Sequence, residues 1–591
     1  MPIIKNPLSG GVNFTNLDNA LDELDLTLGV YRSFSVTNTL TNCTTSNSSI
    51  TTGECSIYSA TITATSGYTL TGASVSITMN GVDITSTAYN NGSITISGVS
   101  GNIVIVISAV QAAPSNPYLS FIGDGFFRLQ TVNNLKNWDG TLQYSTDTTN
   151  WSVWDGVDVL ASDLVDGEYV LYLRGTGNTV ISGEEGEQGS PYFTLTGTAT
   201  EIECQGNIEN LLDYQMVANN QHPPMASFAF LALFDGCDKL VTIPELPTTT
   251  LADYCYADMF SDCIGLTNVS SLILPATTLA EGCYSEMFYN CSNLTSAPAL
   301  PATALASSCY SYMFYGCTSL TAAPSLPATT LAEDCYSGMF EDCTSLTNAP
   351  TLSATTLASN CYTYMFANCS SLTNAPTLSA TILADYCYAN MFSDCTSLTS
   401  APALSSITLA EGCYVGMFGG CTSLTSAPAL PATTLAGGCY GYMFSGCTSL
   451  TSAPTLPSMT LSDYCYQYMF TGCTSLTSSP VLPATTLATG CYYHMFDDCT
   501  SLTSIPSLHA LNLEERCYFE MFYNCSSIKL SETQTGEYQT PYRIPTNGVG
   551  VDNTSTMINM FINTGGTFTG TPTINTTYYL SNTNSVVTAN S

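Results

Sequence analysis

Residues 278–291 read TLAEGCYSEMFYNC, and residues 292–301 continue as SNLTSAPALP. The same pattern returns along the second half of the chain, in eleven cysteine pairs that begin at Cys255/Cys263 and end at Cys517/Cys525. The two cysteines of a pair are always 8 residues apart, and successive pairs are 26 residues apart except for one step of 28. A fixed period of this size indicates a repeat protein in which each unit stacks on the next.

Each unit is predicted to contain one short helix. Thr278 is followed three residues later by Glu281, which is a capping box. The apolar residues that follow fall on one face of a helix: Leu279, Cys283, Tyr284, Met287 and Phe288. The residue before the second cysteine is always Asp, Asn or Gly, and these types tolerate the left-handed conformation that ends a helix.

The stretch after the second cysteine is predicted to be a short strand or turn. Leu294, Ala297 and Leu300 are expected to point inward, and Pro298 prevents a long strand. Neither piece buries its apolar face alone, but stacked neighbours do. The expected fold is an α/β leucine-rich-repeat solenoid of about twelve repeats over residues 229–530, with Thr and Ser on its concave strand side.

The core of the unit resembles the BspA-like leucine-rich-repeat family. The residues that carry the resemblance form M-F-x-x-C-x-x-L-T: Met287, Phe288, Cys291, Leu294 and Thr295. The resemblance covers residues 229–530, although each unit is longer than is usual in the family. It implies adhesion at a bacterial surface, and the front of the chain resembles modules joined to such arrays in bacteriophage and gut-bacterial surface proteins.

The front of the chain divides into smaller modules. Residues 1–30 are predicted to form an N-terminal attachment helix, which either docks or oligomerises, or packs on the next domain. Residues 31–113 are predicted to be an Ig-like β-sandwich, because Asn80-Gly81 and residues 90–92 give hairpin turns between alternating segments. Residues 114–200 are predicted to be a second β-sandwich module.

The second module holds all three tryptophans of the chain: Trp138, Trp151 and Trp154. Tryptophans on strands are interpreted as core residues, with a sugar-stacking platform as the alternative. Residues 201–228 are predicted to be an N-terminal cap of the solenoid. Residues 531–591 are predicted to be a C-terminal cap, because MINMF at 557–561 imitates the M-F core.

The chain is strongly acidic. Its 591 residues carry 45 Asp and Glu against 9 Lys and Arg, which gives a net charge of −36. No Lys or Arg lies between Lys239 and Arg516, whereas 18 Asp and Glu do. Such a surface repels phosphate backbones and anionic membranes, so neither nucleic acid nor membrane is an expected partner.

The opening MPIIKNPLSGGVNF lacks the basic and apolar regions of a secretory signal. No run of about 18 apolar residues is present, so no membrane insertion is expected. Only 9% of residues are charged, and a surface of Asn, Ser, Thr and Gly is typical of extracellular or virion proteins. A virion component made in the host cytoplasm reconciles these features, with the bacterial cell surface as the alternative location.

The cysteines of the repeats are predicted to be free. A helix of eight residues separates the two thiols of a pair by roughly 12 Å, whereas a disulfide needs α-carbons within about 7 Å. A bridge along the second column is conceivable, but its thiols would compete. That column is predicted to be a structural ladder of buried thiols: Cys263, Cys291, Cys317, Cys343, Cys369, Cys395, Cys421, Cys447, Cys473, Cys499 and Cys525.

Cys43 and Cys55 flank a polar loop in the first sandwich, and the sequence leaves open whether they are bridged. No metal or cofactor is expected, because the chain has only three histidines. No phosphate loop, zinc-protease motif or nucleophile elbow appears. The acid pair Asp497-Asp498 suits a glycosidase, but its place at a predicted helix end favours a structural role. The chain is therefore predicted not to be an enzyme.

One variable column is a candidate binding surface. The second x of C-Y-x-x-M-F lies off the predicted apolar face, and four of its members are tyrosines: Tyr312, Tyr364, Tyr442 and Tyr468. Exposed tyrosines offer a large contact area at low entropic cost, so these four are predicted to contact a ligand. The alternative is that they only cover the helical side of the solenoid.

These features predict an adhesion protein of a bacteriophage tail or head fibre. Its expected partners are a glycan or protein of the host surface, and other virion proteins through the N-terminal region. A homo-oligomer is a further possibility. The alternatives are a bacterial surface adhesin and a glycan-degrading fibre enzyme.

Overall fold

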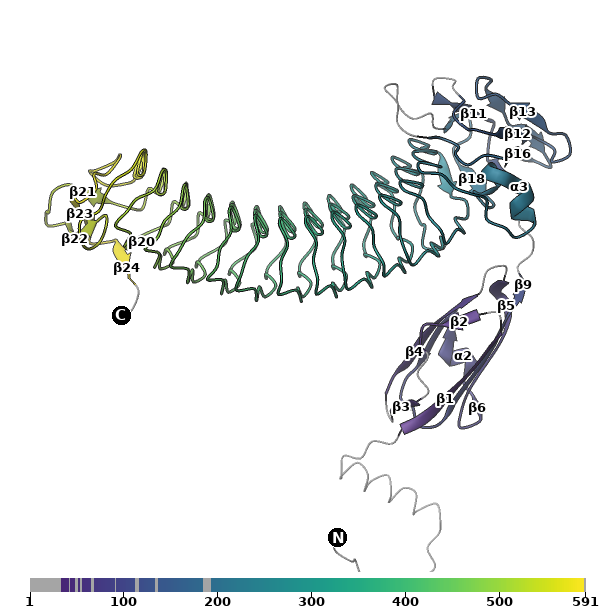
Figure 1. Ribbon diagram of the computed structural model, residues 1–591, viewed down its shortest axis with the longest axis horizontal. Coiled ribbons are helices and arrows are strands. Elements are labelled where there is room, and N and C mark those ends of the chain that lie inside the picture. The colour runs from purple at the N-terminus through teal and green to yellow at the C-terminus, as the bar shows by residue number, and fades with distance from the viewer. Residues whose placement is uncertain are drawn as a thin grey trace, which may run out of the picture. The chain divides into compact units, whose positions relative to one another are not determined.

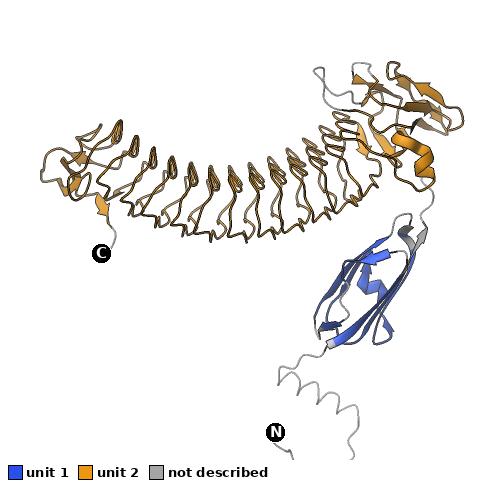
Figure 2. Ribbon diagram, viewed as in Figure 1, with its two compact units in different colours: residues 1–115 blue, residues 116–591 orange. Residues whose placement is uncertain are grey.

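The computed structural model describes residues 33–41, 43–47, 51–53, 56–64, 68–90, 92–111, 116–132, 136–183 and 193–588. The chain forms two compact units, residues 1–115 and 116–591 (Figures 1 and 2). The predicted attachment helix of residues 1–30 lies outside the described residues. Within them, no helix is long and apolar enough to cross a membrane.

The first unit consists of two sheets around one apolar core. The first sheet has the strand order β3 (Thr51–Gly53), β1 (Ser33–Thr41), β9 (Ile103–Gln111), β5 (Tyr68–Met79) and β6 (Val82–Asp83). The second has the order β2 (Cys43–Thr45), β4 (Tyr58–Ala64), β8 (Ser93–Ile96) and β7 (Tyr89–Asn90). Alternate residues of β4, β8 and β9 fill the core.

Both predicted hairpins of this unit are present. Asn80 and Gly81 have φ of 51° and 78° between β5 and β6, and the second turn joins β7 to β8. The stretch between them is not a continuous strand, because residues Thr85–Ala88 form the one-turn helix α2. Cys43 is a buried free thiol, and Cys55 lies outside the described residues.

The second unit begins with a β module. One sheet has the order β13 (Ser152–Trp154), β12 (Thr141–Ser145), β16 (Glu168–Thr176), β10 (Leu119–Gly123), β18 (Ile202–Gln205) and β19 (Leu240–Thr242), and β15 (Asp163–Val165) also pairs with β16. A smaller sheet has the order β14 (Leu160–Ala161), β11 (Phe127–Thr131) and β17 (Phe193–Gly197). Helix α3 (Asn210–Ala218) follows β18.

This module shares one core with the repeats. Strand β18 pairs in parallel with β19, which belongs to the first repeat. The ring of Phe234 contacts the rings of Phe121 and Phe193, and the thiol of Cys237 donates to the carbonyl of Phe193 at 3.2 Å. The front module therefore covers the open end of the stack.

The array, which we define as residues 229–530, is a row of stacked repeats (Figure 1). Equivalent residues of successive repeats form parallel bridges, such as Leu326 to Leu352 and Leu352 to Leu378. Inside the array, buried tyrosine and phenylalanine rings stack in two continuous columns, with ring centroids 5.5–6.0 Å apart.

The far end of the array continues the same packing. Met557, Met560 and Phe561 are buried, and the ring of Phe561 stacks on that of Phe522 at 5.5 Å. Beyond them, β21 (Leu530–Ser531), β23 (Thr577–Ser581) and β22 (Tyr538–Arg543) form a sheet, and β20 (Ser504–Pro506) pairs with β24 (Ser585–Val587).

The prediction of a helix in each repeat is wrong. The array contains no helix, and the segment between the paired cysteines is instead a run of tight turns. In the repeat of residues 254–262, φ is positive at Tyr254, Asp258 and Asp262, at 53–54°. The array is built from turns and short bridges, which corrects the α/β assignment.

The backbone hydrogen bonds of this turn segment explain its conformation. The amides of Tyr256 and Phe260 donate to Cys283 and Met287 of the next repeat, whereas those of Ala257 and Met259 donate three residues back. Alternate amides thus bond between repeats and within a repeat. Every second donor depends on a neighbouring repeat, so stacking satisfies groups that a helix would satisfy internally.

Candidate functional site

The candidate site is the turn face, which we define as the outward surface of the turn segments (residues 254–262 and their equivalents in each repeat). Every fourth residue of a turn segment adopts the left-handed conformation, which creates three columns along the array. Gly, Asn and Asp are frequent in these columns because they tolerate positive φ. The third column is the residue before the second cysteine, as its composition indicated.

The four predicted tyrosines lie in the second left-handed column. Their φ angles are 53–58°, a conformation that bulky residues rarely adopt. The side chains of Tyr364 and Tyr442 are exposed, at 38% and 41%, and those of Tyr312 and Tyr468 are half-buried. The structure places these residues along one face, but on turns rather than on helices.

Tyr312, and several tyrosines of the first left-handed column, place their rings over a glycine of the next repeat. A Cβ built on Gly338 would come within 2.1 Å of the Tyr312 ring. The same relation joins Tyr254 to Gly282, Tyr386 to Gly412 and Tyr464 to Gly490. The missing Cβ makes room for the ring, so a tyrosine followed 26 or 28 residues later by glycine is a sequence signal for this packing.

The aromatic side chains of the turn face form two clusters. Toward the end of the array, Tyr442, Tyr468 and His494 stack in sequence, with ring centroids 4.6 and 4.7 Å apart. The imidazole of His494 is buried between two carboxylates, with its Nδ1 3.0 Å from Asp497 and its Nε2 3.2 Å from Glu520. The two carboxylates of the acid pair Asp497-Asp498 therefore have different partners. Asp497 contacts the His494 imidazole, and Asp498 accepts a hydrogen bond from the side-chain amide of Asn524.

The other group lies nearer the front of the array. The ring of Tyr315 stacks on Tyr289 at 4.5 Å, and the ring of Tyr312 meets Tyr315 edge-on at 6.0 Å. Tyr289 and Tyr315 were not predicted as site residues, because they lie three positions after the chosen column. Their stacking and hydrogen-bonding partners lie in neighbouring repeats, so the sequence of a single repeat does not reveal them.

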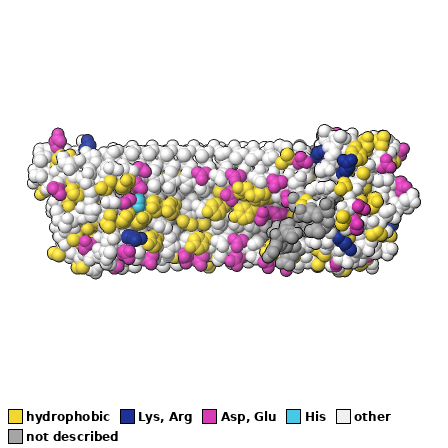
Figure 3. All heavy atoms as spheres, turned by 90° about the horizontal axis from the view of Figure 1, so that it is seen from above, with side chains coloured by type: hydrophobic (Ala, Val, Ile, Leu, Met, Phe, Trp, Pro, Cys, Tyr) yellow, Lys and Arg dark blue, Asp and Glu magenta, His cyan; other side chains and the backbone are white. Residues whose placement is uncertain are grey.

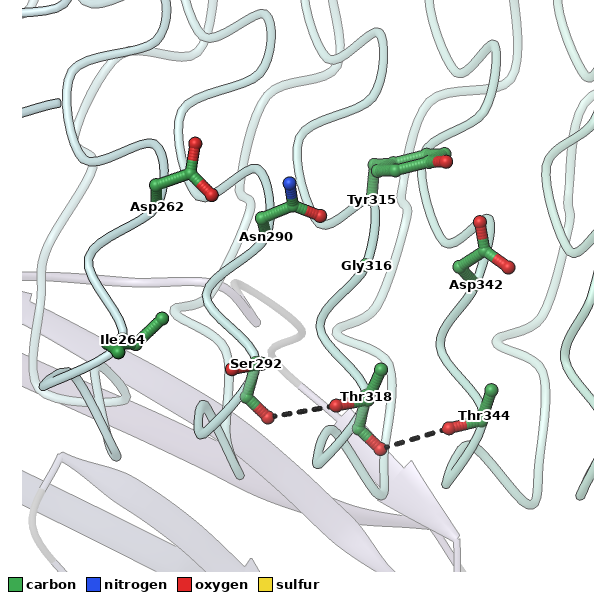
Figure 4. Close-up of a pocket in the computed structure, with 9 residues that line it drawn as sticks. All are labelled: Asp262, Ile264, Asn290, Ser292, Tyr315, Gly316, Thr318, Asp342 and Thr344. Atoms are coloured by element: carbon green, nitrogen blue, oxygen red, sulfur yellow. Dashed lines mark hydrogen bonds between the residues drawn. The ribbon is translucent and has the colours of Figure 1, made fainter. Parts of the chain in front are cut away.

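A shallow groove of about 470 Å³ lies beside this group (Figure 4). One side presents Asp262, Asn290 and Asp342 from three repeats, and Tyr315 of the intervening repeat lies between the last two. On the other side the hydroxyls of Thr318 and Thr344 donate to the carbonyls of the preceding repeat. A hydrogen bond to Asp342, followed by burial, raises the pKa of Tyr315.

Charge and apolar surface occur together on this face. Figure 3 shows a band of hydrophobic side chains along the array, with Asp and Glu on both of its sides. The Tyr254 hydroxyl donates to Glu281 at 3.0 Å, and that of Tyr386 donates to Glu411 at 3.2 Å. The sequence of the array supplies no Lys or Arg between Lys239 and Arg516 to neutralise these acids.

The turn face lies on the inner side of the curve. In Figure 1 the coiled turn segments follow the concave edge of the array. On the turn face, the stacked rings of Tyr289 and Tyr315, and of Tyr468 and His494, are also closer, at 4.5 and 4.7 Å, than the core rings, at 5.5–6.0 Å, as expected on the compressed side. The expectation that the Thr- and Ser-rich stretch forms the concave side is therefore wrong.

The cysteine ladder lies in the core of the array. All of its members are buried free thiols. The thiol of Cys291, for example, donates to the carbonyl of Phe260 at 3.1 Å, and the Cys263 amide donates to the same carbonyl. Burial raises the pKa of Cys447 to about 12, so the thiol stays protonated and serves as a donor between repeats.

The tryptophans of the front module do not form an open platform. Trp138 and Trp154 are buried and contact each other at 5.1 Å. Trp151 is half-buried, and the guanidinium of Arg174 lies 3.9 Å from its ring centre. The same guanidinium lies 4.2 Å from the ring centre of Tyr214, so it is held between two aromatic faces.

Among the described residues, no group of three or more His, Cys, Asp or Glu side chains is arranged to hold a metal ion. The turn face offers stacked rings, hydroxyls and carboxylates. These groups suit recognition by contact, because rigid rings with polar edges offer a large contact area.

Comparison with protein families identifies the repeats. The BspA type Leucine rich repeat region matches residues 232–322, 283–425 and 414–529. The chain therefore belongs to the BspA type leucine-rich-repeat family, as the resemblance indicated. This family is consistent with adhesin-type function at surfaces and is typically non-enzymatic. No curated protein matches the chain.

Proposed function

We propose that the protein is a non-enzymatic adhesion protein that recognises a cell surface through the turn face of its array. The observation that carries the proposal is the row of exposed and half-exposed tyrosines on that face, with carboxylates beside them. Tyrosine is favoured in binding surfaces because a large rigid ring loses little entropy on contact. The BspA type family supports this class of function.

We further propose that the protein acts in a bacteriophage tail or head fibre, as a solenoid of about twelve repeats behind two sandwich modules. Support comes from a composition poor in charged residues, at 9% of the chain, in which 45 Asp and Glu stand against 9 Lys and Arg. In this arrangement the N-terminal region would attach to the particle, and the array would contact a host glycan or protein.

The second candidate is a bacterial cell-surface adhesin. The observation that favours it is the family itself, since BspA type repeats are consistent with adhesin-type proteins. Both candidates assign the same role to the turn face and differ only in what carries the chain.

Binding to cells tests the common role. The fluorescently labelled full chain would be incubated with a panel of bacterial strains, beside residues 1–115 and residues 116–591 as separate proteins. The cut falls at 115/116 because the front module from residue 116 shares its core with the array. We expect residues 116–591 to bind at least one strain as the full chain does. Binding by residues 1–115 alone would refute the assignment to the array.

Antibody labelling tests the location. Gold-labelled antibodies against residues 116–591 should decorate the fibres of phage particles if the chain is a virion protein. Labelling of intact bacterial cells without phage would instead support the adhesin.

A further inference from the structure

Glu341 is a carboxylate on the turn face without a partner among the described residues. Its side chain is half-buried, and it forms no hydrogen bond or ion pair with a described residue. It follows Tyr289 and Tyr315 in the same column, at steps of 26 residues, so it lies beyond the Tyr315 ring in the next repeat. Other acids of the face, such as Glu281 and Glu411, accept a bond from a tyrosine hydroxyl.

Two aromatic rings border this carboxylate. Tyr289 stacks on one face of the Tyr315 ring, and Tyr315 precedes Glu341 in the column. The Tyr312 ring lies over Gly338, three residues before Glu341, and meets Tyr315 at an interplanar angle of 63°. The two rings form a corner next to the carboxylate, and Asp342 accepts the bond from the Tyr315 hydroxyl at its edge.

The corner lacks a cation of its own. Burial, and then the neighbouring Asp342, raises the pKa of Glu341 to about 7. Burial also raises the pKa of Tyr312, with Glu341 and Glu286 adding to the effect. No Lys or Arg occurs between Lys239 and Arg516 in the sequence, so the array supplies no positive charge to this place.

We propose that the corner formed by Tyr312, Tyr315 and Glu341 binds an organic ammonium group, the lysine side chain of a basic protein surface. A cation is attracted to aromatic ring faces and to a carboxylate at once, and partial burial strengthens both attractions. A lysine-rich partner fits the face best, because the array carries 18 Asp and Glu and no Lys or Arg over residues 240–515.

Other cationic ligands fit the site less well. A divalent metal needs about six oxygen ligands, whereas no group of three or more His, Cys, Asp or Glu side chains among the described residues is arranged to hold a metal ion. A phosphocholine group carries a phosphate that the acidic face repels. The inference deepens the recognition function proposed above, because it names the chemical class of partner that the same face takes.

The test uses the full chain and N-acetylated, amidated octalysine in calorimetric titrations at about 0.15 M salt, where remote surface charges are largely screened. Glu341→Gln should bind about tenfold more weakly than the wild type, by loss of a half-buried charge partner. Glu411→Gln is the control, because it removes the same charge from a carboxylate of the same face that already accepts a hydrogen bond from the Tyr386 hydroxyl. It should change the affinity for octalysine less than twofold. Equal losses in the two variants would overturn the proposal.

The aromatic wall is tested separately. Asn tolerates positive φ, so Tyr312→Asn removes the ring without new backbone strain, and Tyr312→Phe retains the ring. We expect weaker octalysine binding for Tyr312→Asn and unchanged binding for Tyr312→Phe, with thermal melting showing that both variants are folded. Unchanged binding in Tyr312→Asn would contradict a role for the ring.

The source of the ammonium group is decided by a second probe. Glucosamine oligomers carry the same kind of charge on a glycan, and per amine they should bind more weakly than octalysine. Tighter binding of the glucosamine oligomers would overturn the assignment to a protein surface. If octalysine does not bind while the chain still attaches to cells, the ammonium site is refuted and the proposed recognition function stands.

Discussion

The packing of tyrosines over glycines makes a quantitative prediction at Gly338. Gly338 and Gly438 both adopt the left-handed conformation, with φ of 58° and 59°. A Cβ on Gly438 would meet no heavy atom within 4 Å, whereas a Cβ on Gly338 would come within 2.1 Å of the Tyr312 ring. Gly438→Ala is therefore a matched control for Gly338→Ala.

The two substitutions differ only in the displaced ring. Alanine in a left-handed position costs about 1–2 kcal/mol, and both variants incur this cost. Gly338→Ala must also move Tyr312 away from Tyr315, which forfeits an aromatic contact of about 0.5–1.5 kcal/mol. We expect Gly338→Ala to destabilise its part of the array by about 1 kcal/mol more than Gly438→Ala does.

Hydrogen exchange is the suitable assay, because repeat arrays open locally rather than as one unit. Amides of the turn segments around residues 312–338 should exchange faster in Gly338→Ala than those around 438 in the control. In a Tyr312→Asn background, where the ring is absent, the two alanine substitutions should cost the same. If Gly338→Ala costs no more than Gly438→Ala with Tyr312 present, the packing argument is refuted.

Three further outcomes follow from the structure. Because the thiols of the cysteine ladder are buried and protonated, they should not react with a thiol reagent in the native protein, and they should all react in guanidinium chloride. Rapid reaction of these thiols in the native protein would contradict this. The pKa of Glu341 is raised above its unfolded value, so its contribution to stability is present below about pH 4 and is lost as the pH rises through about 7. Glu341→Gln should therefore melt higher than the wild type at pH 8 and no higher at pH 4, by calorimetry. Phe366→Ala in the stacked core should destabilise the array by about 3–5 kcal/mol, measured by hydrogen exchange, and a loss below 1 kcal/mol would contradict its full burial.

The repeat period and the composition of each column were readable from the sequence, because stacked repeats impose the same demands on every unit. The apolar positions of Cys283, Tyr284, Met287 and Phe288 predicted a buried face, and all four are buried. They also predicted a helix, and this was wrong because turns that recur every four residues give the same apolar spacing over one short segment. The frequent Gly, Asn and Asp at every fourth position were the signal that distinguishes a segment of turns from a helix.

The candidate site was only partly predictable. Tyr364 and Tyr442 were chosen from one column and are exposed, but their environment depends on side chains 26 residues away. The partnership of Tyr312 with Tyr315, and the place of Glu341 beside them, require the register between repeats, which a single unit does not contain. The face that carries them also depends on curvature, which follows from the turn conformation and not from the apolar pattern.

Cell attachment by turn-face variants tests the central claim most directly. Tyr364→Asn/Tyr442→Asn removes the two exposed rings, and Asn suits their left-handed backbone because Asn390 occupies the same column. The control Ile382→Thr/Met459→Thr removes two exposed apolar side chains from columns in which most members are Thr. We predict that the tyrosine variant of the full chain loses at least about tenfold in affinity for a strain that the wild type binds, as expected for two central aromatic contacts, while the control binds as the wild type does. Undiminished binding by the tyrosine variant, or a loss in the control alone, would contradict recognition through the turn face.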